Sequence, residues 1–422
     1  MTQLTDDCFA FSGPLMPLAE MERLIVERIA PVAGIERVPL AQAGGRIAAA
    51  DVVAPIPLPP FDNSAVDGYA VRHADLKADA ETRLKISGRL TAGRSTETPA
   101  GAGEAIRIFT GAPMPPGTDT VFMQEDTEVE GDVVTVPSGL KKGANRRLAG
   151  EDTRAGDIVI AAGTRLAARH VALAAALGLT ELDVRRRLRV AIFSTGDEVV
   201  EPGGPLGKAA IFDANRFLLA ELLKQFGATV TDLGILRDDP EALSRAIHEA
   251  AANHDLVLTS GGVSTGEADH VRSAVERVGK LVFWRIGIKP GRPVAMAVIR
   301  NGAGSAAFAG LPGNPVAVFV TFVKVVRPLL LRLSGAVPQP LIAVPVRAAF
   351  GYRKKKGRRE YVRVSLRVAA DGELEAVKFP QDGAGVLTSL TATDGLLEFS
   401  EDVTEIESGT RVGFLSYAAL AG

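Results

Sequence analysis

Apolar and polar residues alternate most regularly between about residues 188 and 334. Two short apolar runs, 190–193 and 256–259, each lead into a polar turn that contains glycine. Leucines recur at helical spacing over 215–226, and Asp239-Pro240 has the pattern of a helix N-cap followed by proline at the first helical position. Alternating strands and helices of this kind predict a three-layer α/β domain with a doubly wound parallel sheet, whose ligands lie at the carboxyl ends of the strands.

The segments on either side of this region have other patterns. Apolar residues at helical spacing predict an N-terminal helix over about 18–29 and a second helix over about 167–177. Between them, short β-like pieces separated by glycine and proline predict a β-rich domain over about 51–151. Strand-like runs return after Ser334, around the hairpin signal Asp371-Gly372, and predict a small C-terminal β-domain.

The composition narrows the class of protein. The 422 residues carry 48 basic and 50 acidic side chains, and this balance disfavours a nucleic-acid coat or a membrane-surface protein. The single cysteine and five scattered histidines exclude a thiolate zinc site, so any metal is expected to be a hard cation on oxygen ligands. The first residues do not resemble a signal peptide and no apolar run is long enough to span a bilayer, so we expect a cytoplasmic protein. The length of 422 residues predicts two to four domains.

The segment Ser260-Gly-Gly-Val-Ser-Thr-Gly-Glu-Ala-Asp269 follows one of the predicted strands. Its glycines allow the backbone to approach a ligand, and a helix expected to begin near Ala268 would direct N–H groups at an anion. Glu267 and Asp269 would repel that anion unless a cation lay between them, which favours Mg²⁺ bridging carboxylates to phosphate. An ordinary strand-to-helix loop is the alternative interpretation.

Further polar segments lie in the same region. Ser194-Thr-Gly-Asp-Glu198 follows a strand, and Asp197 or Glu198 could bind a metal or the amino groups of a ligand. Asp197 and Asp213 could instead be helix caps. Gly310-Leu-Pro-Gly-Asn-Pro315 predicts a rigid turn into a helix.

Three polar segments lie outside the α/β region. Two carboxylates, Asp62 and Asp67, stand in an apolar frame over 60–72, which suits either a turn or a polar site. Basic and acidic side chains are neighbours over 145–152, and they could form salt bridges with one another or contact a ligand. Six cations in seven residues at 353–359 form either a solvated loop or a positive field for a phosphorylated ligand, and the scarcity of nearby aromatic residues disfavours RNA. With no Ser-His-Asp order, cysteine nucleophile or HExxH motif, the residues alone favour Mg²⁺-dependent chemistry on a phosphorylated ligand.

In this order, nine motifs resemble those of the molybdopterin molybdenumtransferase family, the molybdenum-insertion enzymes of molybdenum cofactor biosynthesis. They are PFDNSAVDGYAVR (60–72), RIFTGAPMPPGTDTVFMQE (107–125), NRRLAGED (145–152), FSTGDE (193–198), DANR (213–216), LRDDP (236–240), TSGGVSTGEADH (259–270), IKPGRP (288–293) and GLPGNPVAVF (310–319). The resemblance implies four parts: a helical linker domain formed by 14–51 and 155–187, an inserted β-rich domain over 52–154, a molybdopterin-binding α/β domain over 188–336, and a C-terminal β-barrel-like domain over 337–422.

The resemblance also implies a reaction and its partners. Such a transferase takes adenylylated molybdopterin and molybdate, inserts the metal into the pterin dithiolate with the help of Mg²⁺, and releases AMP. Relatives are elongated homodimers in which the inserted domain of one chain faces the α/β domain of the other. Other proteins of molybdenum cofactor biosynthesis are expected as further partners, whereas nucleic acid and membrane are not.

Matched motif by motif, the resemblance implies a set of site residues. The catalytic residues would be Asp62, Thr110, Asp152, Glu198, Asp238 and Asp269, and the last three would also bind Mg²⁺. The substrate-binding residues would be Ser194, Thr195, Gly196, Asp213, Ser260, Gly261, Gly262, Ser264, Lys289, Arg292, Pro312, Pro315 and Arg358. Two positions depart from the pattern, because Arg285 and Ala384 stand where relatives often have lysine and serine.

Two other classes of function remain open at this point. One is a non-catalytic binding or scaffold protein with the same domains, against which the six matching catalytic positions count. The other is a pyrophosphatase or amidase built on the α/β domain alone, which the matching inserted domain disfavours.

Overall fold

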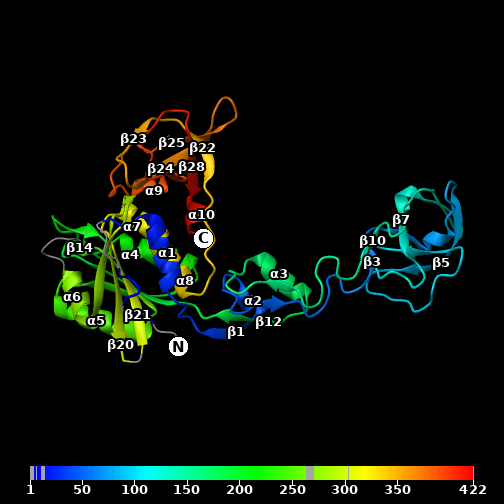
Figure 1. Cartoon of the computed structure of the whole chain (residues 1–422), viewed down its shortest axis with the longest axis horizontal. Helices are drawn as coiled ribbons and strands as arrows, with labels where there is room; N and C mark the ends of the chain where they lie inside the picture. The colour runs from blue at the N-terminus through cyan, green and yellow to red at the C-terminus, as the bar shows by residue number, and fades with distance from the viewer. Residues whose placement is uncertain (1–3, 6, 11–14, 263–269, 303, 422) are drawn as a thin grey trace.

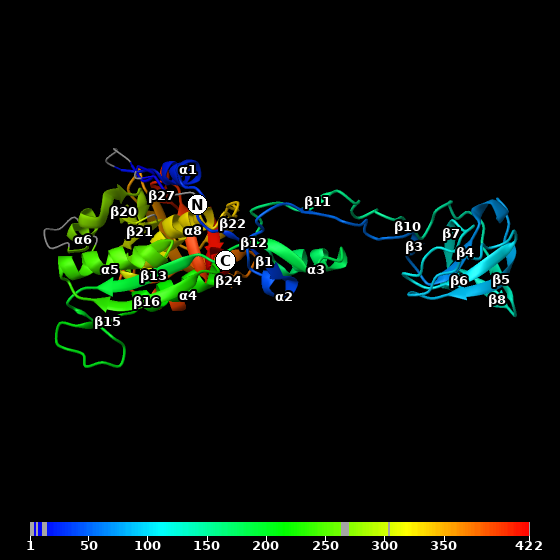
Figure 2. The same ribbon diagram turned by 90° about the horizontal axis from the view of Figure 1, so that it is seen from below.

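The computed structural model describes residues 4–5, 7–10, 15–262, 270–302 and 304–421. The molecule is elongated: the α/β and C-terminal domains form one end, a small linker domain lies in the middle, and the inserted β-rich domain forms the other end (Figure 1). Two extended segments, containing β2 (Val52–Val53) and β11 (Ile158–Ile160), lead to the inserted domain (Figure 2). Among the described residues, no helix has the length and apolar character needed to cross a membrane.

A six-stranded sheet forms the middle layer of the α/β domain. Its strands, in spatial order, are β16 (Thr229–Leu236), β13 (Arg189–Thr195), β17 (Leu256–Ser260), β21 (Gly304–Leu311), β20 (Pro293–Asn301) and β18 (Gly279–Arg285). The first four strands are parallel, as predicted for a doubly wound sheet, but β20, next to the edge strand β18, is antiparallel to both of its neighbours. A parallel connection needs about a dozen residues of crossover, and the chain between β20 and β21 is far too short for one.

Helices cover both faces of this sheet. Their bounds are α1 (Leu18–Arg28), α4 (Asn215–Gln225), α5 (Pro240–Asn253), α6 (His270–Val278), α7 (Pro315–Thr321) and α8 (Arg327–Leu333), with a π-helical turn (Phe322–Val326) between the last two. Val190 and Ile192 of β13 pack with α1, α4, α7 and α8, whereas Ala191 and Phe193 pack with α5 and α6. Alternate side chains of a strand point to opposite faces, so burial on both faces explains the continuous apolar run. The predicted cap is confirmed, because Asp239 accepts a hydrogen bond from the Ala242 N–H at 2.6 Å. The start of a helix expected near Ala268 lies outside the described residues.

The linker domain is built from two segments that are far apart in the sequence. β1 (Ile35–Pro39) pairs antiparallel with β12 (Glu181–Arg185), and α2 (Leu40–Ala43) and α3 (Ala168–Ala176) complete the core. The linker therefore holds the two ends of the inserted segment together. α1, although it precedes the linker strands, packs instead on the α/β domain.

The inserted domain contains a second six-stranded sheet. Its strands, in spatial order, are β7 (Thr120–Met123), β4 (Gly68–Val71), β6 (Glu104–Ile108), β5 (Thr82–Leu90), β9 (Val133–Val136) and β8 (Glu128–Glu130). Apolar residues form a cluster on each side of this sheet, so the domain has its own core. A short pair, β3 (Asn63–Ser64) with β10 (Arg146–Arg147), lies where the domain meets its two connecting segments (Figure 1).

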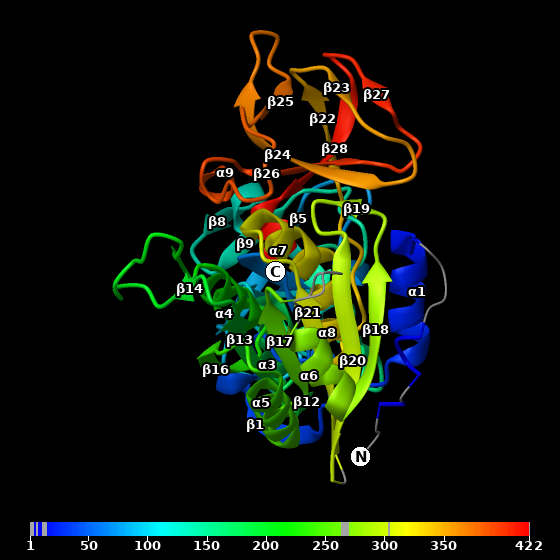
Figure 3. The same cartoon turned by 90° about the vertical axis from the view of Figure 1, so that its left-hand side faces the viewer.

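The C-terminal domain is a closed five-stranded barrel, because β26 pairs with both β28 and β24. Its strands, in order around the barrel, are β24 (Arg359–Val368), β25 (Leu374–Lys378), β22 (Val344–Ala348), β28 (Arg411–Ser416) and β26 (Gly395–Phe399), with α9 (Thr388–Thr391) and α10 (Tyr417–Ala421) beside them. β24 and β25 flank Asp371-Gly372 as an antiparallel pair, which confirms the predicted hairpin. β19 (Ile288–Lys289) of the α/β domain adds to β24, so a strand joins the two domains (Figure 3).

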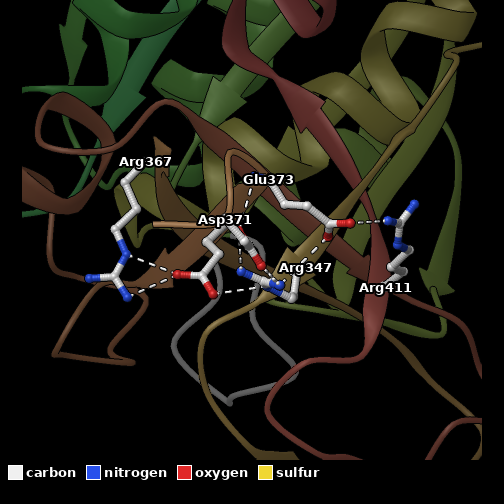
Figure 4. Close-up of polar contacts among 6 residues, drawn as sticks. Arg347, Arg367, Asp371, Glu373 and Arg411 are labelled. Carbon is white, nitrogen blue, oxygen red and sulfur yellow. Dashed lines mark hydrogen bonds and ion pairs between the residues drawn. The ribbon is translucent and has the colours of Figure 1, made fainter. Parts of the chain in front are cut away.

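Charged side chains on the barrel pair with one another. Arg347 binds Asp371 at 2.6 Å and Glu375 at 2.9 Å, and Arg411 binds Glu373 at 2.6 Å (Figure 4). These pairs connect β22, β28 and the β24–β25 hairpin. Each exposed pair stabilises little, but the network accounts for charges that would otherwise suggest a ligand site.

Candidate functional site

Three parallel strands of the α/β domain end side by side. β13 ends at Thr195, β17 at Ser260 and β21 at Leu311, and the Gly261 N–H donates to the Leu311 carbonyl at 3.1 Å. We call the last residues of these strands together with the residues that follow them, 194–198, 260–262 and 311–315, the sheet edge. Ser194, Thr195 and Ser260 are buried in it. The structure thus brings six of the predicted substrate-binding positions at the ends of β13 and β17 together with Pro312 and Pro315 after β21.

The two glycines after β17 are required by the geometry of the sheet edge. Gly261 and Gly262 have φ values of 92° and 62°, in the left-handed region that favours glycine. A Cβ on Gly262 would lie 2.6 Å from a methyl carbon of Val271, so any side chain there would collide with α6. The predicted close approach of backbone at this turn is therefore present, although Ser264 lies outside the described residues.

Several buried polar atoms in or next to the sheet edge lack a hydrogen-bond partner among the described residues. The hydroxyl oxygens of Ser194 and Thr259 and the side-chain oxygen of Asn215 are buried without a hydrogen bond. Asn215 donates from its Nδ2 to Ser260 Oγ at 2.8 Å and to the Gly313 carbonyl at 2.7 Å. Asn215 is not among the residues predicted from the sequence, although its place in the DANR motif was the available signal. Buried polar atoms are rarely left unpaired, so this edge is suited to receive a polar ligand.

The carboxylates predicted around this edge have different surroundings. Asp238 is half-buried, and its Oδ1 accepts a hydrogen bond from the Thr195 hydroxyl. Glu198 is exposed in the turn before β14 (Val199–Val200). Asp269 lies outside the described residues, within which no group of three metal-ligating side chains is present. The potential metal ligands among the described residues, Glu198 and Asp238, offer carboxylate oxygens, which are the type of ligand that a hard cation such as Mg²⁺ prefers.

Asp213 has structural partners. Its Oδ1 caps α4 by accepting the Arg216 N–H at 3.2 Å, and its Oδ2 accepts the Arg216 Nε at 3.0 Å. The buried Arg216 guanidinium also binds Asp232 and Glu201, the latter at 2.6 Å. Within the chain, Asp213 therefore acts as a cap of α4 and as the ion-pair partner of Arg216.

Two cavities adjoin where the α/β domain meets the barrel. The first, which we call the interdomain pocket, has a volume of about 360 Å³, and the residues that line it include Lys289, Pro290, Pro312, Asn314, Tyr352, Glu360, Arg363, Asp382 and Ala384. The second, which we call the cationic pocket, has a volume of about 280 Å³, and its charged lining residues are Lys289, Arg292, Lys355, Lys356 and Arg358. Both cavities share Lys289, Pro290 and Gly291 as a wall. Of the two departures from the family pattern, Ala384 lies in the interdomain pocket, whereas Arg285 lines neither cavity.

The cationic run 353–359 is less available to ligands than its charge suggests. Arg353 binds Glu405 at 2.7 Å, and Arg359 binds Glu401 at 2.9 Å. Lys354 donates to the Arg358 carbonyl at 2.7 Å, so its ammonium group stabilises the turn. The exposed side chains of Lys355 and Lys356 remain directed to the cationic pocket.

The predicted residues of the inserted domain form a separate group near β3 and β10. Asp62 accepts the Ala149 N–H at 2.7 Å and pairs with Arg146. These contacts, the backbone hydrogen bond first, lower the pKa of Asp62. Thr110 donates from its N–H and its hydroxyl to Asp67, both at 2.8 Å, and Asp152 is exposed. Within one chain this group lies far from the sheet edge (Figure 1), so the five predicted catalytic positions that the structure describes do not meet in one chain.

These hydrogen bonds predict that acid destabilises the inserted domain. The pKa values of six of its carboxyl groups are lowered: those of Asp62, Asp67, Asp75, Glu104, Asp119 and Glu151. A carboxyl whose pKa is lower in the folded than in the unfolded state contributes stability above pH ~4, and this contribution disappears as pH falls through the folded value. Calorimetry between pH 6 and pH 3 is expected to show a separate transition of the inserted domain moving to lower temperature.

Fluorescence of Trp284 provides the internal control for this acid unfolding. It is the only tryptophan, is fully buried in the α/β domain, and donates from its Nε1 to the Phe9 carbonyl at 2.9 Å. Its signal is expected to remain native while the inserted domain unfolds. A single transition that shifts equally by both measurements at every pH would contradict the prediction.

Three parts of this chain match models of known protein families. The α/β domain matches the description "probable molybdopterin binding domain" over residues 191–332, which places the chain among molybdopterin-binding proteins. Residues 16–178 match the MoeA N-terminal region (domain I and II), and residues 345–417 match the MoeA C-terminal region (domain IV). The chain belongs to the MoeA family, the molybdopterin molybdenumtransferases. The expected resemblance and fold class are thereby confirmed.

Individual relatives agree with this assignment. A molybdopterin molybdenumtransferase of Haemophilus influenzae is 35% identical over 97% of this chain and 100% of its own length. One from a Nostoc species is 38% identical over 89% of this chain and 87% of its own. The crystal structure of a molybdopterin biosynthesis MoeA protein from Pyrococcus horikoshii, 30% identical, covers 96% of this chain and 100% of its own with a TM-score of 0.78.

Proposed function

We propose that this protein inserts molybdate into adenylylated molybdopterin in a Mg²⁺-dependent reaction that releases AMP. The observation that carries the proposal is the pair of adjoining cavities beside a sheet edge with unpaired buried polar atoms. Both substrates are anions, and cationic side chains from two domains line these cavities. The family relationship supplies the chemistry, and we propose that it takes place in the cytoplasm.

The two cavities suit different parts of this chemistry. In the interdomain pocket, Lys289 and Arg363 are the cations, and a pocket of this size admits a tetrahedral oxyanion with its water. Arg363 donates to the Gln381 and Gly383 carbonyls, which hold its guanidinium in place. We assign molybdate to this pocket. We assign a phosphate of the pterin substrate to the cationic pocket, where Arg292, Lys355 and Lys356 add positive charge.

At the sheet edge, we propose that Ser194 and Asn215 orient the pterin substrate through their unpaired oxygens. Glu198 and Asp238, together with Asp269, are the residues that we propose to hold Mg²⁺, which would neutralise phosphate charge while the phosphoanhydride is cleaved. The pterin dithiolate supplies sulfur for molybdenum, so the protein needs no cysteine ligand. Cys8, the single cysteine, is buried.

We propose further that two chains form a homodimer with shared sites. The exposed apolar side chains of Phe61 and Leu148 lie near Asp62 and Asp152 in the inserted domain. At the other end of the molecule, Phe212 and Phe217 are exposed around the start of α4, close to the sheet edge. Contact between these two surfaces across a dimer would bury both and would bring the two groups of predicted residues together.

The decisive assay supplies adenylylated molybdopterin, Mg²⁺ and molybdate, and follows AMP and molybdenum cofactor over time. We expect AMP release that depends on both molybdate and Mg²⁺, with cofactor formed in equal amount. Folded protein that releases no AMP would favour the scaffold alternative. AMP release without molybdate and without cofactor would favour a pyrophosphatase.

A further inference from the structure

Glu360 is a buried carboxylate that lies beside the wall shared by the interdomain pocket and the cationic pocket. It belongs to β24 of the barrel, at the position that pairs with Lys289 of β19 from the α/β domain. Its side chain is only 1% exposed. The residue therefore lies where the two domains are joined, beside the wall that the interdomain pocket and the cationic pocket share.

Both oxygens of Glu360 are occupied by donors from different elements. Oε1 accepts the Arg358 Nε at 2.7 Å, and Oε2 accepts the Tyr352 hydroxyl at 2.8 Å and the Lys289 Nζ at 3.3 Å. Burial alone would raise the pKa of Glu360, but these donors lower it below its usual value. The carboxylate is therefore ionised at neutral pH and is a fixed acceptor.

Lys289 and Arg358 each use only some of their N–H groups to bind Glu360. The side chains of Lys289 and Arg358 are 46% and 35% exposed, so other N–H groups of each remain accessible from the pockets. Without an acceptor between them, both flexible side chains would be free to adopt many rotamers. Preorganised donors bind a ligand better because less conformational entropy is lost on binding.

We propose that Glu360 is a positioning residue for oxyanion binding, which holds Lys289 and Arg358 so that their free N–H groups face the two pockets. The inference rests on the proposed assignment of molybdate to the interdomain pocket. Glu360 acts through the cations and makes no favourable contact with the anion itself.

The sign of one substitution separates positioning from simple electrostatics. A carboxylate beside an anion pocket repels the anion, so if only charge mattered, Glu360→Gln would bind molybdate more tightly than the wild type. If positioning dominates, the same substitution releases Lys289 and Arg358 and weakens binding. The two explanations therefore predict opposite changes.

Isothermal titration with molybdate at fixed ionic strength tests the proposal in the full-length protein. We expect Glu360→Gln to weaken binding about tenfold, the loss of one well-placed charged contact. The matched control is Glu401→Gln, which removes a carboxylate paired with Arg359 in the same domain that lines neither pocket. The control is expected to bind as the wild type does. Unchanged or tighter binding by Glu360→Gln overturns the proposal.

A double-substitution cycle shows whether Glu360 acts through Lys289. If it does, Glu360→Gln adds little to the loss already caused by Lys289→Met, whereas a purely structural role would give additive losses and would overturn the proposal. Should Glu360→Gln fail to fold, Glu360→Asp keeps the net charge, retracts the carboxylate by one methylene and is still expected to weaken binding; unchanged binding would again overturn the proposal. A wild-type protein that binds no molybdate would instead refute the pocket assignment on which the inference rests.

Discussion

A heterodimer of one Asp62→Asn chain and one Glu198→Gln chain is expected to recover about half of the wild-type turnover, although each homodimeric variant is nearly inactive. The reason is geometric, because β3 and β14 lie at opposite ends of the elongated chain (Figure 1), and Asp62 directly precedes β3 whereas Glu198 directly precedes β14. If each site combines the inserted domain of one subunit with the sheet edge of the other, the heterodimer contains one site with both substitutions and one with neither. Loss of one such charged group lowers turnover by about 10²- to 10³-fold in the homodimers.

The experiment uses two affinity tags, one on each variant, so that only heterodimers are assayed for AMP release. The matched control is a heterodimer of Asp62→Asn with Asp152→Asn, two substitutions within the same group. That control leaves one substitution in each site and is expected to stay inactive. Shared sites are ruled out if the Asp62→Asn and Glu198→Gln heterodimer is as inactive as the control.

Replacement of Arg216 by methionine is expected to destabilise the α/β domain by about 3–5 kcal/mol. The side chain is 5% exposed and binds three carboxylates, of which Asp213 is 2% exposed. Removing the cation leaves Asp213 buried without its ion pair. It also frees Glu201, which anchors the segment between β14 and β15 (Ile211–Phe212). Turnover is expected to fall as well, because Glu198 lies only three residues before Glu201, in the turn that precedes β14.

Denaturant unfolding followed by Trp284 fluorescence measures this effect in the same domain. Arg23→Met is the control, because Arg23 pairs with Glu20 and Glu27 on the exposed face of α1 and such pairs contribute little. Adding Asp213→Asn to Arg216→Met is expected to restore part of the stability, since the unpaired charge is then gone. Equal stability of Arg216→Met and Arg23→Met would show that the buried ion pairs are not needed.

The local elements of this protein could be predicted from its sequence. Helical spacing and the Asp239-Pro240 cap predict α4 and α5, and Asp371-Gly372 predicts the β24–β25 hairpin, because these features depend on residues within one or two turns of each other. The motif order also identified the family, which comparison with relatives confirms. The reversed direction of β20 was missed, since the pattern of apolar residues is the same for a parallel and an antiparallel buried strand.

The pattern of apolar and polar residues thus determined which segments fold into strands and helices, and the motifs determined the family to which the chain belongs. Only the tertiary structure decided which charges are available. Of the run 353–359, Arg353 and Arg359 are bound to glutamates more than 40 residues away, and Arg358 shares Glu360 with a lysine from another domain. Ion pairing and burial depend on contacts between distant segments, and sequence spacing carries no information about those distances.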